Sequence, residues 1–216
     1  MRRRQPADAG GFRPRRAHER LRGHGAHRVN DFSTYILAGG KSSRFGSDKA
    51  RAVVGGRAMI VGVAEELGKL GAPVTVVAAA AGQYADLGLH TIADRVAGIG
   101  PIGGIHSALC DAPGAWVAVV SCDCVGLRAA WVETLLAARR DDVDAVAFRH
   151  ETWEPLLAVY RTSLRDRVET DIAGGRISPR RMLDEVRTRA LPLPVDWRGV
   201  VQVNSPAELE QLERAR

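Results

Sequence analysis

From Thr34 onward, short apolar runs of strand length alternate with longer segments of helix length. A chain with this alternation folds into an α/β domain, because a helix connects each strand to the next parallel strand. We therefore expect three layers, with a mostly parallel central sheet and helices on both of its faces. The expected strands cover residues 34–38, 74–79, 89–93, 116–120, 143–148, 155–160 and 200–203. The expected helices cover residues 58–70, 101–110, 129–139, 162–172, 179–186 and 206–214.

The first 30 residues differ from the rest of the chain in charge. They contain nine arginines and two acidic residues, a balance of +7 in a chain of net charge +6, so residues 31–216 carry −1. Because this segment has few large apolar residues to offset its ordering entropy, we expect a basic disordered tail over residues 1–30. No apolar stretch follows its arginines, so it is not a secretory signal. The length of the remainder predicts one domain over residues 31–216. Its near-neutral charge predicts no nucleic-acid partner.

Two further features favour a cytoplasmic protein without a membrane partner. No apolar run approaches the roughly 18–20 residues that span a bilayer. The chain has three cysteines, an odd and low number that fits a reducing compartment better than a disulfide framework. Cys122 and Cys124 are too few for a zinc site, and we interpret them as small residues that flank Asp123.

The most informative segment is LAGGKSSRFGSDK at residues 37–49, directly after the first expected strand. Its paired glycines let backbone N–H groups approach a ligand closely, and Lys41, Arg44 and Lys49 add positive charge. This combination suits a triphosphate. The spacing excludes a Walker A loop, because Tyr35 stands where that loop needs glycine, and the glycine pair does not supply the dinucleotide-binding pattern either. A surface turn with incidental charges would not explain the ordered series of arginine, glycine, aspartate and lysine.

Two aspartates follow expected strands, where open α/β sheets hold their ligands. Asp123 comes after a strongly apolar strand, and a carboxylate there must be solvated, paired or bound to a metal such as Mg²⁺. Asp94 has a carboxylate that could accept hydrogen bonds from guanine or from ribose hydroxyls. The alternatives are that Asp123 caps a helix beginning near Leu127, and that Asp94 is a turn residue paired with Arg95.

Residues 37–49 resemble the signature loop of nucleotidyltransferases of the glycosyltransferase-A type, Leu-Ala-Gly-Gly-x-x-x-Arg-Phe-Gly-x-Asp-Lys. The glycine pair is most similar to that of the molybdenum cofactor guanylyltransferases, whereas the related cytidylyltransferases usually have Leu-Ala-Ala-Gly. Further segments resemble those of the family in the same order along the chain. They are Asp94 followed by residues 100–105, then residues 121–123, 154–160 and 202–209. The resemblance implies a Rossmann-like nucleotidyltransferase domain, with a nucleotide-binding half over about 33–125 and an acceptor-binding half over about 126–216.

The resemblance also implies a reaction, the transfer of GMP from GTP to the terminal phosphate of the molybdopterin-type molybdenum cofactor. Mg²⁺ would be the cofactor, with Asp123 as its ligand. The implied catalytic residues are Arg44, Lys49 and Asp123, and the implied nucleotide-binding residues are Leu37, Ala38, Gly39, Gly40, Lys49, Asp94 and Asp123. GTP and molybdenum-molybdopterin are the expected partners, together with other proteins of cofactor biosynthesis or acceptor molybdoenzymes.

The acceptor would dock in the second half of the chain, although the arginines there also fit an ordinary solvated helix face. The residues concerned are Arg176, Ser178, Arg180, Arg181 and Asn204.

Three positions depart from the family pattern. Cys124-Val125 stands where a residue followed by proline is usual, Val76 and Ala78 stand in the region of a family asparagine, and Gln202 replaces the first asparagine of a late pair. The alternatives left open are a molybdopterin cytidylyltransferase, a 2-phospholactate guanylyltransferase, and a non-enzymatic protein that binds nucleic acid through the Arg-rich tail.

Overall fold

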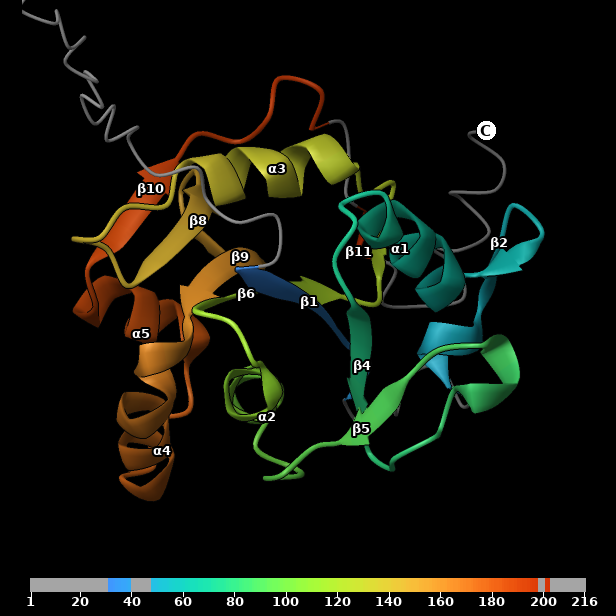
Figure 1. The fold of residues 1–216 in the computed structure, drawn as a ribbon, viewed down its shortest axis with the longest axis horizontal. Helices are drawn as coiled ribbons and strands as arrows, with labels where there is room; N and C mark the ends of the chain where they lie inside the picture. The colour runs from blue at the N-terminus through green and yellow to red at the C-terminus, as the bar shows by residue number, and fades with distance from the viewer. Residues whose placement is uncertain (1–30, 40–47, 198–200, 203–216) are drawn as a thin grey trace, which may run out of the picture.

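The structure is a computed structural model that describes residues 31–39, 48–197 and 201–202. Its centre is a seven-stranded sheet in the order β10-β8-β9-β6-β1-β4-β5 (Figure 1). Neighbouring strands are parallel except for β9, which is antiparallel to both β6 and β8. The strands are β1 (Phe32–Leu37), β4 (Val74–Ala78), β5 (Thr91–Ala93), β6 (Trp116–Ser121), β8 (Ala145–Arg149), β9 (Trp153–Arg161) and β10 (Thr188–Leu191). The predicted, mostly parallel sheet is confirmed.

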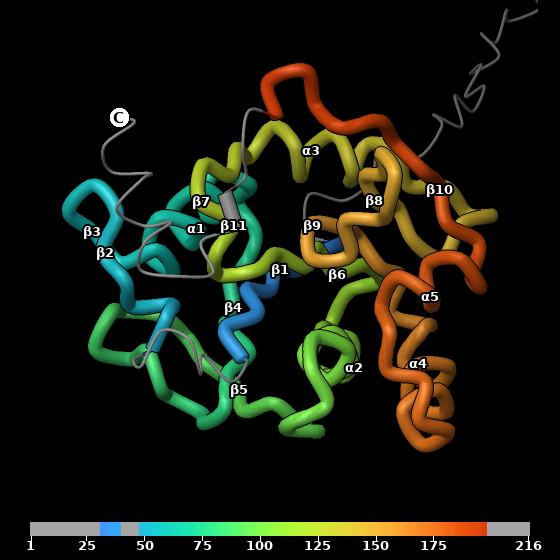
Figure 2. Tube along the Cα trace, turned by 180° about the vertical axis from the view of Figure 1, so that it is seen from behind, coloured from blue at the N-terminus to red at the C-terminus, as the bar shows by residue number. Residues whose placement is uncertain are grey.

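Helices cover both faces of this sheet (Figures 1 and 2). α1 (Met59–Gly68) and α3 (Ala129–Ala137) pack on one face, and α2 (Pro101–Asp111), α4 (Arg165–Ala173) and α5 (Pro179–Glu185) pack on the other. Because successive side chains of a strand point to opposite faces, Ile36 of β1 joins the first core while Tyr35 and Leu37 join the second. In the described part of the chain, no helix is long and apolar enough to cross a membrane.

Several short elements lie at the edges of the sheet. η1 (Lys49–Arg51) is followed by a hairpin of β2 (Val53–Val54) and β3 (Arg57–Ala58), and η2 (Ala85–Leu87) and η3 (Thr162–Leu164) are single 3₁₀ turns. The hairpin turns at Gly55 and Gly56, whose φ angles of 57° and 82° favour glycine. β7 (Cys124–Val125) pairs antiparallel with β11 (Val201–Gln202) in a separate small sheet.

Three differences from the expected elements concern short segments. The late strand exists, but it pairs with β7 rather than joining the main sheet. β10 and the β2–β3 hairpin were not predicted, because β10 is a partly exposed edge strand and the hairpin strands have two residues each. The expected tail over residues 1–30 and the expected helix over 206–214 lie outside the described residues.

The order of the strands determines where a ligand can bind. β1 lies between β4 and β6, and the chain reaches β4 through α1 on one face and β6 through α2 on the other. The chain therefore adds strands first on one side of β1 and later on its other side, which makes this the topological switch point of the sheet. β1, β4, β5 and β6 are parallel, so the segments that follow them meet at one edge of the sheet.

Candidate active site

The glycine-rich segment begins at this edge, where β1 ends. Leu37 is buried, the N–H of Ala38 donates to the carbonyl oxygen of Val77 at 2.9 Å, and Gly39 is exposed beyond them. Leu37 and Gly39 both line a cavity of about 520 Å³. Gly40 and Arg44, which the sequence predicts to contact the phosphates, lie outside the described residues.

The cavity lies between the ends of β1, β4 and β5 and the first turn of α2. Leu37, Val77, Ala79 and Pro101 form apolar walls, and Asp94 is the one charged side chain among the described residues that line it. Cavities of several hundred Å³ with apolar walls and few polar groups are typical of small-molecule sites. The walls suit a planar base, and the carboxylate of Asp94 suits N–H or O–H donors on a nucleoside.

Asp94 is held in place by contacts from α2 and from its own turn. Its Oδ1 accepts hydrogen bonds from the hydroxyl of Ser107 at 2.9 Å and from the N–H of Val96 at 3.1 Å. The Ser107 hydroxyl in turn accepts the N–H of Arg95, also at 2.9 Å. The turn in the alternative interpretation is therefore present, but no ion pair joins Asp94 to the Arg95 side chain within the described residues. Ser107 was not singled out from the sequence, since a serine within a helix gives no signal.

Lys49 and Asp123 meet at the same edge of the sheet, although 74 residues separate them in sequence. The ammonium Nζ of Lys49 donates to Oδ2 of Asp123 at 2.5 Å, and the two side chains are 16% and 12% exposed. The structure thus brings together two of the three predicted catalytic residues. An ammonium and a carboxylate so close are mutually neutralised, and both remain near a surface where an anionic ligand could approach.

The residues around Asp123 exclude one alternative interpretation. α3 begins at Ala129 with Arg128 in the N-cap position, so Asp123 does not cap that helix. Cys122 and Cys124 are buried in the core, and burial raises the pKa of the Cys122 thiol to about 12. They therefore remain protonated at neutral pH, as suits the small core residues that the sequence suggests.

The chemistry of Asp123 fits a Mg²⁺ ligand. Its Oδ2 contacts Lys49, while Oδ1 receives no hydrogen bond from the described residues. The described residues contain no cluster of three or more His, Cys, Asp or Glu side chains that could hold a metal alone. Mg²⁺ commonly takes one or two protein carboxylates, with phosphate oxygens and waters completing its octahedron, so Asp123 could serve as one of its ligands.

Glu154 is a second carboxylate near Asp123 that was not assigned a role from the sequence. It is the second residue of β9, beside the end of β6, and the two acids line a small cavity of about 10 Å³ with Trp197. Burial raises the pKa of Glu154, although the positive charge of Arg180 opposes this. The sequence signal that could have identified Glu154 was a polar residue at the start of an otherwise apolar strand.

The arginines of the second half have separate structural contacts. Arg176 donates to buried Asp171 at 2.6 Å, Arg181 donates to Glu185 at 2.7 Å, and Ser178 caps α5. Those three side chains stabilise the turn before α5 and the helix itself. This agrees with the alternative interpretation of these residues as part of an ordinary solvated helix face. Arg180 differs, because it forms no ion pair within the described residues and its Nε donates to the carbonyl oxygen of Trp153 at 3.3 Å. Asn204 lies outside the described residues.

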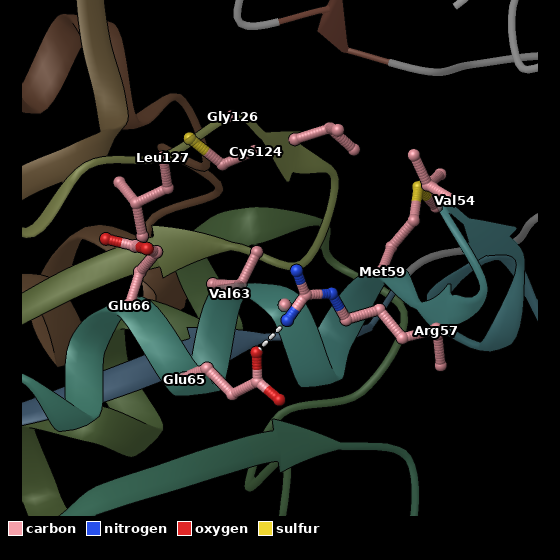
Figure 3. Close-up of a pocket in the computed structure, with 12 residues that line it drawn as sticks. Val54, Arg57, Met59, Val63, Glu65, Glu66, Cys124, Gly126 and Leu127 are labelled. Carbon is pink, nitrogen blue, oxygen red and sulfur yellow. Dashed lines mark hydrogen bonds and ion pairs between the residues drawn. The ribbon is translucent and has the colours of Figure 1, made fainter. Parts of the chain in front are cut away.

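A second pocket, of about 140 Å³, lies between α1, the hairpin and β7 (Figure 3). Its inner wall is apolar and includes Met59, Val63 and Cys124, while the ion pair between Arg57 and Glu65 lies at its rim. None of its described lining residues is a predicted site residue, and we assign it no function.

Comparison with known proteins identifies the family. Residues 34–191 match the MobA-like NTP transferase domain. The chain belongs to this family. A probable molybdenum cofactor guanylyltransferase of Deinococcus radiodurans is 36% identical over 82% of this chain and 91% of its own length. The molybdenum cofactor guanylyltransferase of Photobacterium profundum is 31% identical over 83% of this chain and 94% of its own. The chain is therefore a nucleotidyltransferase, as the signature loop predicts.

Solved structures agree with this assignment. The molybdopterin-guanine dinucleotide biosynthesis protein A of Archaeoglobus fulgidus has a TM-score of 0.72 and 25% identity, covering 85% of this chain and 97% of that one. A CMP:2-keto-3-deoxy-manno-octonic acid synthetase, at 17% identity and a TM-score of 0.68, covers 86% of this chain and 98% of its own. The latter similarity shows the fold alone. The predicted Rossmann-like nucleotidyltransferase fold is confirmed.

Proposed function

We propose that this chain transfers GMP from GTP to the terminal phosphate of the molybdopterin-type molybdenum cofactor. The observation that carries the proposal is the Lys49–Asp123 pair beside the cavity of Asp94, at the switch point of a MobA-like fold. Two relatives that cover most of the chain are named as molybdenum cofactor guanylyltransferases, one of them as probable, which supports guanine as the donor base. Gly39 of the signature loop points to the same donor.

The proposed donor site combines the cavity with the ion pair. The guanosine occupies the cavity, where Asp94 accepts hydrogen bonds from its base or ribose. The triphosphate then extends toward Lys49, and the backbone N–H groups that follow Leu37 and Ala38 bind its oxygens. The ammonium of Lys49, together with Arg44, neutralises the leaving pyrophosphate.

The proposed reaction is an in-line displacement at the α-phosphorus of GTP. An oxygen of the acceptor's terminal phosphate forms a bond to this phosphorus, the bond to the β-phosphate oxygen breaks, and pyrophosphate leaves with the electron pair. No general base is needed, because a phosphate nucleophile is already ionised near neutral pH. Mg²⁺, when bound, would supply positive charge that offsets the charge of the phosphates. Asp123 would hold that ion, and Lys49 keeps Asp123 oriented.

The proposed acceptor side lies beyond Asp123, at the start of β9 and the end of β8. Arg149 lies over the ring of Trp153, with 4.6 Å from its guanidinium carbon to the ring centroid, and Arg180 contacts the Trp153 carbonyl from α5. Both arginines are exposed, and the charge of Arg180 acts on Glu154, which lines the small cavity together with Asp123. An anionic acceptor is attracted by these two cations, which makes Arg149 and Arg180 the described residues best suited to bind its phosphate.

The first experiment is thermal unfolding of the purified chain with GTP, CTP, ATP or UTP, each with and without Mg²⁺. A ligand that binds only the folded state raises the Tm. We expect a Mg²⁺-dependent rise with GTP alone, followed by pyrophosphate release when molybdenum-molybdopterin is added. A rise in Tm with CTP instead would mean that CTP is the donor. Release of pyrophosphate with 2-phospholactate would mean that this compound is the acceptor. An unchanged Tm with all four nucleotides would reject the proposal.

The proposed reaction belongs in the cytoplasm. All three cysteines are free thiols in the structure, which suits a reducing compartment. Its products would pass to acceptor molybdoenzymes or to other proteins of the cofactor's biosynthesis, the partners expected from the sequence.

A further inference from the structure

Tyr84 forms a polar cluster with Asp48, near the end of the signature loop, and with its own neighbour Gln83. Its side chain is fully buried, and its hydroxyl lies 3.0 Å and 3.1 Å from the two carboxylate oxygens of Asp48. The side-chain amide of Gln83 donates to the Tyr84 hydroxyl at 3.1 Å and more weakly to Asp48 at 3.4 Å. We call these three residues the Tyr84 anchor.

The direction of the hydrogen bonds in the Tyr84 anchor follows from chemistry. Burial and the neighbouring Asp48 carboxylate both raise the pKa of Tyr84, so the phenol keeps its proton and donates it to Asp48. A hydrogen bond to a charged acceptor contributes more than one between neutral groups. Tyr84 and Gln83 both lie in the connection between β4 and β5. Their hydrogen bonds therefore restrain Asp48 from that side.

Asp48 transmits this restraint to Lys49. Its Oδ1 accepts the N–H of Ala50 at 3.1 Å, so Asp48 is the N-cap of η1, and Lys49 is the first residue of that turn. The far end of the turn is also fixed, because Arg51 donates to both carboxylate oxygens of Asp86 at 2.7 Å and 2.9 Å. The backbone of Lys49 is therefore bound from both sides, while its Nζ reaches Asp123.

We propose that Tyr84 and Asp48 are positioning residues for Lys49, which fix its ammonium group at Asp123 for the triphosphate of the nucleotide. Tyr84 acts through Asp48, and Asp48 acts through the η1 turn. The inference rests on the proposed role of Lys49 in nucleotide binding. The proposal predicts that loss of the Tyr84 hydroxyl changes how Lys49 is held, although Tyr84 is not among the described residues that line the cavity.

A second buried tyrosine provides a matched control. Tyr35 is 1% exposed, and its hydroxyl donates to Asp111 at 2.9 Å at the far end of α2. Tyr35→Phe and Tyr84→Phe each remove a hydrogen bond from a buried phenol to an aspartate, and Tyr84→Phe also removes the bond from Gln83, so both should lower the free energy of unfolding. Only Tyr84→Phe removes a bond to the N-cap of η1.

Lysine NMR gives a readout that needs no nucleotide. The chain has three lysines, at positions 41, 49 and 69, so selective ¹³C,¹⁵N-lysine labelling yields a spectrum that Lys69→Arg and Lys41→Arg variants assign. We expect the two ε-methylene protons of Lys49 to have distinct shifts in the wild type and in Tyr35→Phe, and to converge in Tyr84→Phe and Asp48→Ala. Asp48→Asn keeps an N-cap and an acceptor, and should restore the distinct shifts. Unchanged Lys49 signals in Tyr84→Phe would overturn the proposal.

Calorimetric binding of Mg²⁺-GTP supplies the functional arm. We expect about tenfold weaker binding for Tyr84→Phe, wild-type affinity for Tyr35→Phe, and no added loss when Tyr84→Phe is combined with Asp48→Ala. Equal losses in the two tyrosine variants, or independent losses in the double variant, would refute the coupling. If the wild type binds no nucleotide, the proposed function fails, while the lysine spectra still decide whether the Tyr84 anchor positions Lys49.

Discussion

The ammonium of Lys49 lies 2.5 Å from Oδ2 of Asp123, and this contact joins the η1 turn to the segment that follows β6. The two groups follow neighbouring strands of the sheet, since η1 comes after β1 and Asp123 comes after β6. In the proposed reaction, the lysine would face the phosphates of the nucleotide and the carboxylate would face Mg²⁺. The ion pair therefore keeps two oppositely charged groups in position before the ligand arrives, which limits reorganisation during the reaction.

Lys49→Ala should lower kcat by about 100-fold or more, because it removes a positive charge from the leaving group. The fold should remain intact, since the lysine side chain is not part of either core. Steady-state turnover and circular dichroism test these two statements. Lys69→Ala is the matched control, because Lys69 is 60% exposed in a pair with Glu66 and should leave kcat unchanged. A wild-type kcat for Lys49→Ala would reject the catalytic assignment.

Asp123→Asn should abolish the dependence of nucleotide binding on Mg²⁺, because the amide keeps the size of the side chain but loses the charge that binds the ion. The measurement is the difference in Tm between GTP alone and GTP with Mg²⁺. Asp166→Asn is the control, since Asp166 is 81% exposed on α4. If Asp123→Asn retains the full Mg²⁺-dependent rise in Tm, then Asp123 is not the metal ligand.

The sequence predicted the fold, because the strand and helix signals are local, and it singled out individual candidate site residues by their type and place. Lys49 and Asp123 each follow a strand pattern and stand out as charged residues, but their contact depends on which strands are neighbours. Ser107 and Tyr84 gave no signal, because a hydroxyl in a helix or a tyrosine in a loop is ordinary until its partner is known. Conversely, Arg176 drew attention as a possible acceptor ligand, whereas its partner Asp171, five residues earlier, explains it as a structural residue.

Gly103→Ala should destabilise the protein by about 1–3 kcal/mol, the usual range for overpacking a well-packed site. A Cβ atom there would lie 2.6 Å from the carbonyl oxygen of Val96 and 3.1 Å from Oδ2 of Asp94. Because Asp94 must then move, the KM for GTP should rise as well. Gly68→Ala is the control, since no atom lies within 4 Å of its added Cβ, and it should be neutral or slightly stabilising. Urea unfolding and GTP titration measure both effects, and equal stability of the two variants would contradict the close packing.

Asp171→Asn should lower stability at neutral pH by about 1–2 kcal/mol, an effect limited by solvent screening because Arg167 and Arg176 are 38% and 40% exposed. Burial alone would raise the pKa of Asp171, but hydrogen bonds from Arg176 and Arg167 lower it below its ordinary value of 3.8. A carboxyl whose pKa is lower in the folded state stabilises the protein fully above its unfolded pKa, and this contribution disappears as the pH falls through the folded pKa.

The pH dependence of Asp171→Asn is therefore its decisive property. Urea unfolding should separate the variant from the wild type at pH 7, and the two should converge in acid, where the wild-type carboxyl is also protonated. Asp166→Asn again serves as the control, because its exposed pair with Arg165 is screened by solvent and should contribute little to stability. A difference between Asp171→Asn and the wild type that stays constant into acid would mean that packing, rather than the charge of Asp171, stabilises the turn before α5.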